Sequence, residues 1–185
     1  MDVNSESQQG FEGEAALDLT EREGALAAAV LELVRHARSE GADGSRATSR
    51  FAFFITDELL SERPELRAVL PEETVAQAAG DPHHLTSIET GTTHSEVGHE
   101  LSVATWPSGL AGGYVQGLVR GSSEAGPGHV DTSRVFVAVG ALLTGETFCA
   151  VEPAEGAALR VGRAVVPELV AALSSSLGIE PRDPA

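Results

Sequence analysis

Histidines and carboxylates gather in one stretch near the middle of the sequence. The stretch holds four histidines and three glutamates: His83, His84, His94, His99, Glu89, Glu96 and Glu100. Both residue types bind zinc, but a metal-binding helix places two histidines four residues apart so that both point to one side. His94 and His99 are five apart and would diverge on a helix. We therefore expect a polar segment here, with no metal ion and no other cofactor.

Two further side chains have the chemistry of nucleophiles. Cys149 is the only cysteine, so the chain alone supplies neither a disulfide nor a cysteine metal cluster. A reactive thiol needs partly exposed, electropositive surroundings, whereas Cys149 sits in an apolar run. Ser123, the central residue of Gly121–Ala125, nearly matches the serine of a nucleophile elbow, but the run lacks the second glycine. We expect a buried, inert thiol and no serine hydrolase.

Arginines supply the one binding site that we single out. Arg35 and Arg38 fall on the first expected helix, and Arg160 and Arg163 precede the last one. Such residues ordinarily form exposed ion pairs of small energy. If the four guanidinium groups instead converge, they would form a basic patch that binds a small anion or an acidic peptide.

The charge of the whole chain excludes several classes of partner. The formal net charge is −16, and all twelve basic residues are arginines. Nucleic acids and anionic membranes both require a basic surface, so we expect neither as a partner. The absence of lysine also excludes a phosphate-loop lysine and a Schiff-base lysine. No run reaches the length of a membrane span and no signal peptide is evident, so we expect a cytoplasmic protein.

Periodicity and turn residues place most of the elements. We expect residues 1–14 to form a disordered tail, residues 15–178 to form a single domain, and residues 179–185 to fray at the C-terminus. A capping box at Thr20–Glu23 begins a helix that runs to about Ser39. A strand at Phe51–Ile55 follows, and Thr56 at its end offers a cap for the next helix. Prolines then divide the chain into short helices at Asp57–Arg63, Glu65–Leu70 and Glu72–Ala79. The remaining elements expected before the hairpin are weakly patterned segments at Leu85–Ile88 (extended) and Ser95–Thr105 (helical), a strand at Tyr114–Val119 and an exposed connection at Gly121–Asp131.

A β-hairpin near the C-terminus is the clearest element. Arg134–Leu143 and Glu146–Val151 flank Thr144-Gly145, which suits a two-residue turn. That turn would pair Val139 with Ala150 and would put four side chains on one face, with Cys149 on the other: Val137, Val139, Phe148 and Ala150. Both faces are apolar, so we expect helices to cover one side, and a helix or a partner subunit to cover the other.

The last helix begins near Val165 or Val166, because Pro167 suits a first helical position, and Gly178 ends it. Its apolar residues recur at helical spacing. Successive late strands lack the crossover that parallel pairing requires. The sequence therefore predicts an α+β fold with a mainly antiparallel sheet, a C-terminal hairpin, and packing by the N-terminal and C-terminal helices.

Several segments in this order resemble a family of uncharacterised actinobacterial proteins named after a propionibacterial locus. They are Leu26–Leu33, Ile55–Leu60, Trp106-Pro107, the hairpin through Gly145 and Cys149–Val151, and Val166–Leu173. The resemblance spans about Leu17 to Leu177. It implies a layout similar to the secretion-chaperone-like α+β fold, whose members are often acidic dimers that hold partner polypeptides. It brings no catalytic residue with it.

We accordingly expect a non-enzymatic protein-binding or chaperone-like module, whose partner is another protein or a second copy in a homodimer. The alternative is an enzyme of unknown class. Its site would lie between the His83–Glu100 stretch and the Gly121–Asp131 connection, in a pocket lined by convergent polar groups.

Overall fold

The computed structural model describes residues 18–40, 47–120, 134–153 and 158–179. The tail at 1–14, the Gly121–Asp131 connection with Ser123, and residues 180–185 lie outside these ranges. Along the chain the elements are α1 (Glu21–Glu40), β1 (Thr48–Ile55), α2 (Thr56–Glu62), the 3₁₀ helix η1 (Pro64–Ala68), α3 (Glu72–Gly80), β2 (Leu85–Thr93), α4 (Val97–Ser102), β3 (Gly112–Arg120), β4 (Arg134–Leu142), β5 (Thr147–Glu152), β6 (Arg160–Gly162) and α5 (Pro167–Ser176).

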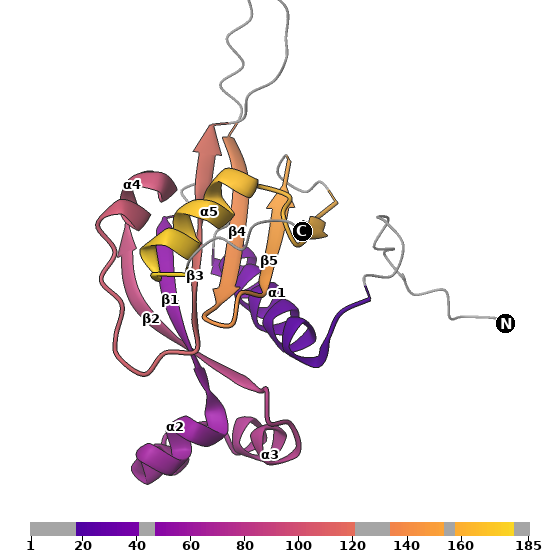
Figure 1. Ribbon diagram of the computed structural model, residues 1–185, viewed down its shortest axis with the longest axis vertical. Coiled ribbons are helices and arrows are strands. Elements are labelled where there is room, and N and C mark those ends of the chain that lie inside the picture. Colours follow the sequence, from indigo (N-terminus) through magenta and orange to yellow (C-terminus); the bar gives the residue numbers. More distant parts are fainter. Residues whose placement is uncertain (1–17, 41–46, 121–133, 154–157, 180–185) are drawn as a thin grey trace, which may run out of the picture.

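The strands form one six-stranded sheet in the order β2-β1-β3-β4-β5-β6 (Figure 1). Every neighbouring pair is antiparallel. The expected α+β fold with an antiparallel sheet is therefore confirmed. Strand β2 forms one edge, and β6, only three residues long, forms the other.

Helix α1 covers one face of this sheet. Its capping box forms as expected: the Thr20 N–H donates to Glu23 Oε2 at 2.9 Å, and the Glu23 N–H donates to Thr20 Oγ1 at 3.3 Å. The apolar stripe of α1 is buried against aromatic and aliphatic side chains from β1, β3, β4 and β5. The core on this side includes Leu26, Val30, Leu33, Phe53, Tyr114, Phe136, Ala138, Phe148 and Ala150.

Helices α4 and α5 cover the opposite face, so the sheet lies between two helical layers (Figure 1). Leu173 of α5 and Val97 of α4 are fully buried there. They pack with residues from the central strands, which are Val115, Val137, Val139, Ala141, Cys149 and Val151. Among the described helices, none has the length and apolar character needed to cross a bilayer.

The hairpin of β4 and β5 forms, but its predicted register is wrong by one residue. Val139 pairs with Cys149, not with Ala150, so Cys149 shares a face with Val137 and Val139, while Phe148 and Ala150 lie on the other. The turn has three residues, 143–145, because the Gly145 N–H bonds the Leu142 carbonyl at 2.9 Å and Gly145 takes a φ of 100°. Glycine is the favoured residue at that left-handed position of a three-residue loop. Helices of the same chain cover both hairpin faces.

Helices α2, η1 and α3 form an arm that projects beyond one end of the sheet (Figure 1). They match the three short helices expected between the prolines. The expected Thr56 cap is wrong, because α2 has no side-chain cap and the Thr56 hydroxyl instead lies 2.8 Å from both His84 Nδ1 and Thr86 Oγ1. These contacts join the start of the arm to the start of β2.

Candidate functional site

The histidines and glutamates of the His83–Glu100 stretch do not meet at one point. His84 contacts Thr56, and His83 Nε2 lies 3.6 Å from Glu21 at the N-terminus of α1. Glu100 is buried and bonds Arg50. No group of three or more potential metal ligands forms anywhere in the described part of the chain.

Glu100 has a structural partner that the sequence pattern did not reveal. Its Oε1 accepts a hydrogen bond from Arg50 Nε at 2.6 Å, and both side chains are 11% exposed. The Arg50 guanidinium also lies 5.6 Å from the Trp106 ring centre and donates from Nη1 to the Thr105 carbonyl at 3.3 Å. Trp106 in turn donates from Nε1 to Ser176 Oγ. This network ties α4 and α5 to β1.

Cys149 is completely buried on the α5 face. Burial raises the pKa of its thiol, and hydrogen bonds from the backbone of Val166 and Val165 offset only part of that rise. A thiolate is thus disfavoured, and the site lacks the exposed, electropositive character of a nucleophilic cysteine.

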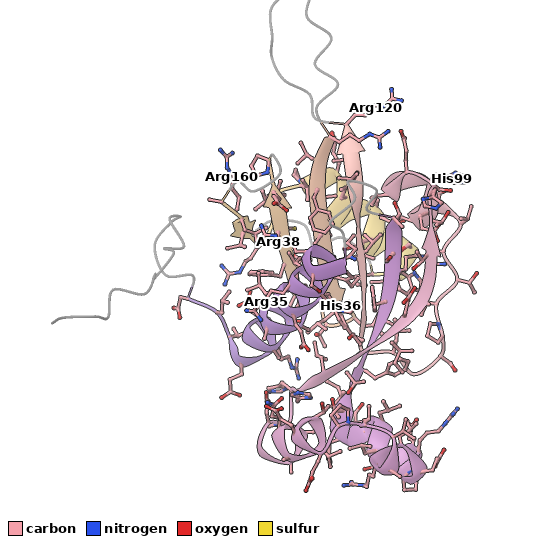
Figure 2. The ribbon with its side chains drawn as sticks, turned by 180° about the vertical axis from the view of Figure 1, so that it is seen from behind. Arg35, His36, Arg38, His99, Arg120 and Arg160 are labelled. Atoms are coloured by element: carbon pink, nitrogen blue, oxygen red, sulfur yellow. The ribbon has the colours of Figure 1, made fainter. Side chains whose placement is uncertain are left out.

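The four arginines do not form one cluster. Arg163 bonds Glu23 at the N-terminal end of α1, with Nε to Oε1 at 2.6 Å, whereas Arg38 bonds Glu152 at 3.3 Å near the C-terminal end. Those two positions on α1 are about 22 Å apart at 1.5 Å per residue. Figure 2 shows Arg35, Arg38 and Arg160 on the same side of the molecule, and Arg160 pairs with Val151, the neighbour of the Glu152 that Arg38 bonds. Anion or peptide binding by these residues stays a prediction.

Two of the cavities on the described surface involve residues of the His83–Glu100 stretch. One, of about 310 Å³, has an apolar floor that includes Ile55, Leu85 and Leu142, and it has Arg22, Glu58 and His83 among its polar lining. The other, of about 220 Å³, lies between His94–Glu96 and the ends of β3 and β4 at Arg120 and Arg134. This second cavity is near the place expected for an enzyme site, but it is smaller than the ~300–1,000 Å³ of most ligand pockets.

Strand β2 turns one row of its backbone groups away from every described strand. The Phe53 carbonyl accepts from the Ala111 N–H at 2.7 Å, on the β3 side. The N–H and C=O of one strand residue point to the same side and alternate along the strand, so Phe53 faces β3 while its neighbours face β2. Ser87, the register partner of Phe53, therefore points its N–H and C=O away from the sheet.

The same alternation assigns Leu85 and Glu89 to the outer edge, giving three residues with outward groups. No described residue pairs with this edge, because β2 is the outermost strand. A bulge between Arg50 and Phe51 interrupts the register beyond Glu89, so Leu85–Glu89 forms the regular part. Proteins commonly protect such edges with charged side chains, proline or bulges. This stretch has one charge, Glu89, no lysine and no proline, and the bulge lies beyond it.

The side chains along this edge leave it accessible. Ser87 and Glu89 are exposed, and Ile88 is 42% exposed. Ile88 pairs with Ala52 and therefore points to the α5 face, beside the half-buried Phe54. An extended segment added to β2 would find free backbone groups and an apolar contact at alternate positions, the arrangement that β-strand addition requires.

Comparison with known proteins gives one match, to a protein family. The model of a family described as PPA1309-like protein matches residues 26–178, which is most of the chain and includes every described strand. Comparisons with curated proteins and with solved structures give no match. The resemblance to a family named after a propionibacterial locus is thereby confirmed, and the chain belongs to the PPA1309-like protein family.

Proposed function

We propose that the protein is a non-enzymatic binding module that holds another polypeptide as an added strand on the outer edge of β2. The observation that carries the proposal is the row of outward backbone groups at Leu85, Ser87 and Glu89. Main-chain hydrogen bonds supply the affinity in this mode of recognition, and side chains at alternate positions supply the specificity. Ile88 and Phe54 offer an apolar contact on one face.

The occupant we propose is a different polypeptide, not a second copy of this chain. Two copies would each bring a net charge of −16, and like charges oppose their association. The apolar faces of the hairpin, from which the sequence suggested a homodimer, are already covered by α1 and α5. Of the two edges of the described sheet, β2 is the longer, with nine residues against three in β6.

Three finer features belong to the same proposal. We place the protein in the cytoplasm of an actinobacterium, which suits a chain with one cysteine and no lysine. We also propose a secretion-chaperone-like layout, an analogy of fold that assigns no function by itself. Fractionation of a producing cell tests the location, and recovery outside the cytoplasm would contradict it.

Binding selection with variants of Ser87 tests the proposed function. A library of random twelve-residue peptides is selected on the wild-type protein, and the recovered peptides are measured by fluorescence polarisation. Ser87→Pro removes one outward N–H, whereas Ser87→Ala keeps it and serves as the matched control. We expect a loss of at least about tenfold in affinity for Ser87→Pro and a change below about twofold for Ser87→Ala.

Folding and self-association are measured alongside binding. Circular dichroism and the melting temperature report whether Ser87→Pro is folded, and Ile88→Lys, which places a charge on the edge, is the second variant. Peptides that bind both variants as tightly as wild type, or a selection that recovers none, would overturn the proposal. So would light scattering that shows a dimer dissociated by Ser87→Pro, because a second copy would then occupy the edge.

A further inference from the structure

We infer that the polypeptide held on β2 carries positive charge at one end, the end that lies beside Leu85. This inference rests on the proposed function and adds the chemistry and the direction of the partner. It follows from the different charges that the fold places at the two ends of the β2 edge.

The Leu85 end of the edge adjoins the acidic arm. Residues 56–82 contain seven carboxylates and two arginines, a formal charge of −5, and all nine side chains are exposed. The carboxylates are Asp57, Glu58, Glu62, Glu65, Glu72, Glu73 and Asp81. Exposed charges of this kind attract an oppositely charged segment and set its orientation.

Contacts place this charge next to the first outward residue. Glu58 lines the same cavity as His83 and Leu85, and Asp81 accepts a hydrogen bond from the His83 N–H at 2.8 Å in the turn that leads into β2. Glu21 is close as well, because its carboxylate lies 3.6 Å from His83 Nε2. Arg22 lines this cavity too and offsets one of the carboxylates.

The Thr93 end of β2 has a different balance of charge. The cavity beyond it is lined by His94, Glu96, Arg120 and Arg134. The two arginines are directly opposite each other in the pairing of β3 with β4, and like charges in that arrangement repel. Among the described residues that line this cavity, Glu96 is the only acidic one. Its contact with Arg120 is long, 3.9 Å, and the Glu96 and Arg120 side chains are 77% and 88% exposed. Glu89 is the one carboxylate within the outward stretch at this end, so arginines of a partner are favoured more strongly at the Leu85 end than here.

The direction of the partner follows from strand geometry. Antiparallel pairing is slightly more stable per residue than parallel pairing, and an antiparallel partner would run from the Thr93 end toward the Leu85 end. Its positively charged residues would then follow the paired stretch, on the C-terminal side. The five residues opposite Leu85–Glu89 would span about 17 Å.

Charged versions of one peptide test this inference. The starting probe is the tightest uncharged peptide from the selection on wild-type protein, extended by three arginines at either its C-terminus or its N-terminus. We expect the C-terminal arginines to tighten binding about fivefold more than the N-terminal ones at low salt, and the gain to fall as salt is added.

Two double variants locate the source of the gain. Glu58→Gln with Glu62→Gln removes two charges from one face of α2, and Glu32→Gln with Glu168→Gln removes two exposed charges from α1 and α5 as the matched control. The first pair should abolish most of the gain from C-terminal arginines, and the second should leave it within about twofold.

The outcomes separate this inference from the proposed function. Equal gains for the two arginine positions, or a gain that survives Glu58→Gln with Glu62→Gln, would overturn the charge inference. The docking edge would stand in that case, provided that the uncharged peptide still distinguishes Ser87→Pro from Ser87→Ala. Failure of that distinction would instead overturn the proposed function.

Discussion

Removing the carboxylate of Glu100 should destabilise the protein strongly, because it leaves the Arg50 guanidinium buried without its anion. The two side chains are joined at 2.6 Å and are each 11% exposed. Breaking a buried pair from one side typically costs about 3–5 kcal/mol. Arg50 keeps its contacts with Thr105 and Trp106, so we expect Glu100→Gln to lose about 3 kcal/mol, the low end of that range.

Urea denaturation measures this loss as a shift of the midpoint at constant slope. The matched control is Glu96→Gln, which breaks the exposed contact with Arg120 at 3.9 Å and should cost less than about 0.5 kcal/mol. Replacing both partners, Arg50→Met with Glu100→Leu, should recover most of the stability lost by Glu100→Gln. A loss below about 1 kcal/mol for Glu100→Gln, or one equal to the control, would refute the burial and the role of this pair in holding α4 on β1.

Three further changes test the packing and the electrostatics of the fold. Gly140→Ala should cost about 1–3 kcal/mol in thermal unfolding, because a Cβ there would meet Val30 Cγ2 at 2.7 Å, whereas Gly98→Ala, with nothing within 4 Å, should not destabilise. The Arg163 side chain lowers the pKa of Glu23 from 4.5 to about 2, so the stability that the ionised Glu23 adds is complete above pH 4.5 and is lost as the pH falls through 2. The free energy of unfolding of Glu23→Gln should therefore be below that of wild type at pH 6 and should converge with it toward pH 2. A difference that stays constant with pH would contradict this. The Cys149 thiol, buried and with a raised pKa, should react with a thiol reagent only at the rate of unfolding, and rapid labelling of the native protein would contradict its burial.

The sequence predicted those elements whose ends are set by residues close by in the chain. The capping box at Thr20, the prolines of the arm and Pro167 each act within a few residues, so α1, the three short helices and α5 were predicted within a few residues of their bounds. The hairpin was predicted too, but Thr144-Gly145 fits turns of two and of three residues, and only the backbone of Gly145 decides between them. One residue of error moved Cys149 to the other face.

The features of the candidate site depend on contacts that are distant in sequence. Strand β2 has little apolar alternation because most of its side chains are exposed or only half-buried, so its sequence pattern is weak. The pairing of Arg50 with Glu100, and that of Phe53 with Ser87, join residues far apart in the chain. A single sequence carries no signal for either pair. The position of β2 at the edge of the sheet, on which the proposed function rests, therefore emerges only from the fold.

Backbone hydrogen exchange along β2 tests the central claim most directly. In the free protein, the outward amides of Ser87 and Glu89 should exchange rapidly, while the inward amides of Thr86 and Ile88, which face β1, should be protected. Addition of a peptide recovered on wild-type protein should slow exchange at Ser87 and Glu89. Outward amides that are as protected as their neighbours in the free protein, or that stay fast with the peptide bound, would contradict the claim that this edge is open and receives an added strand.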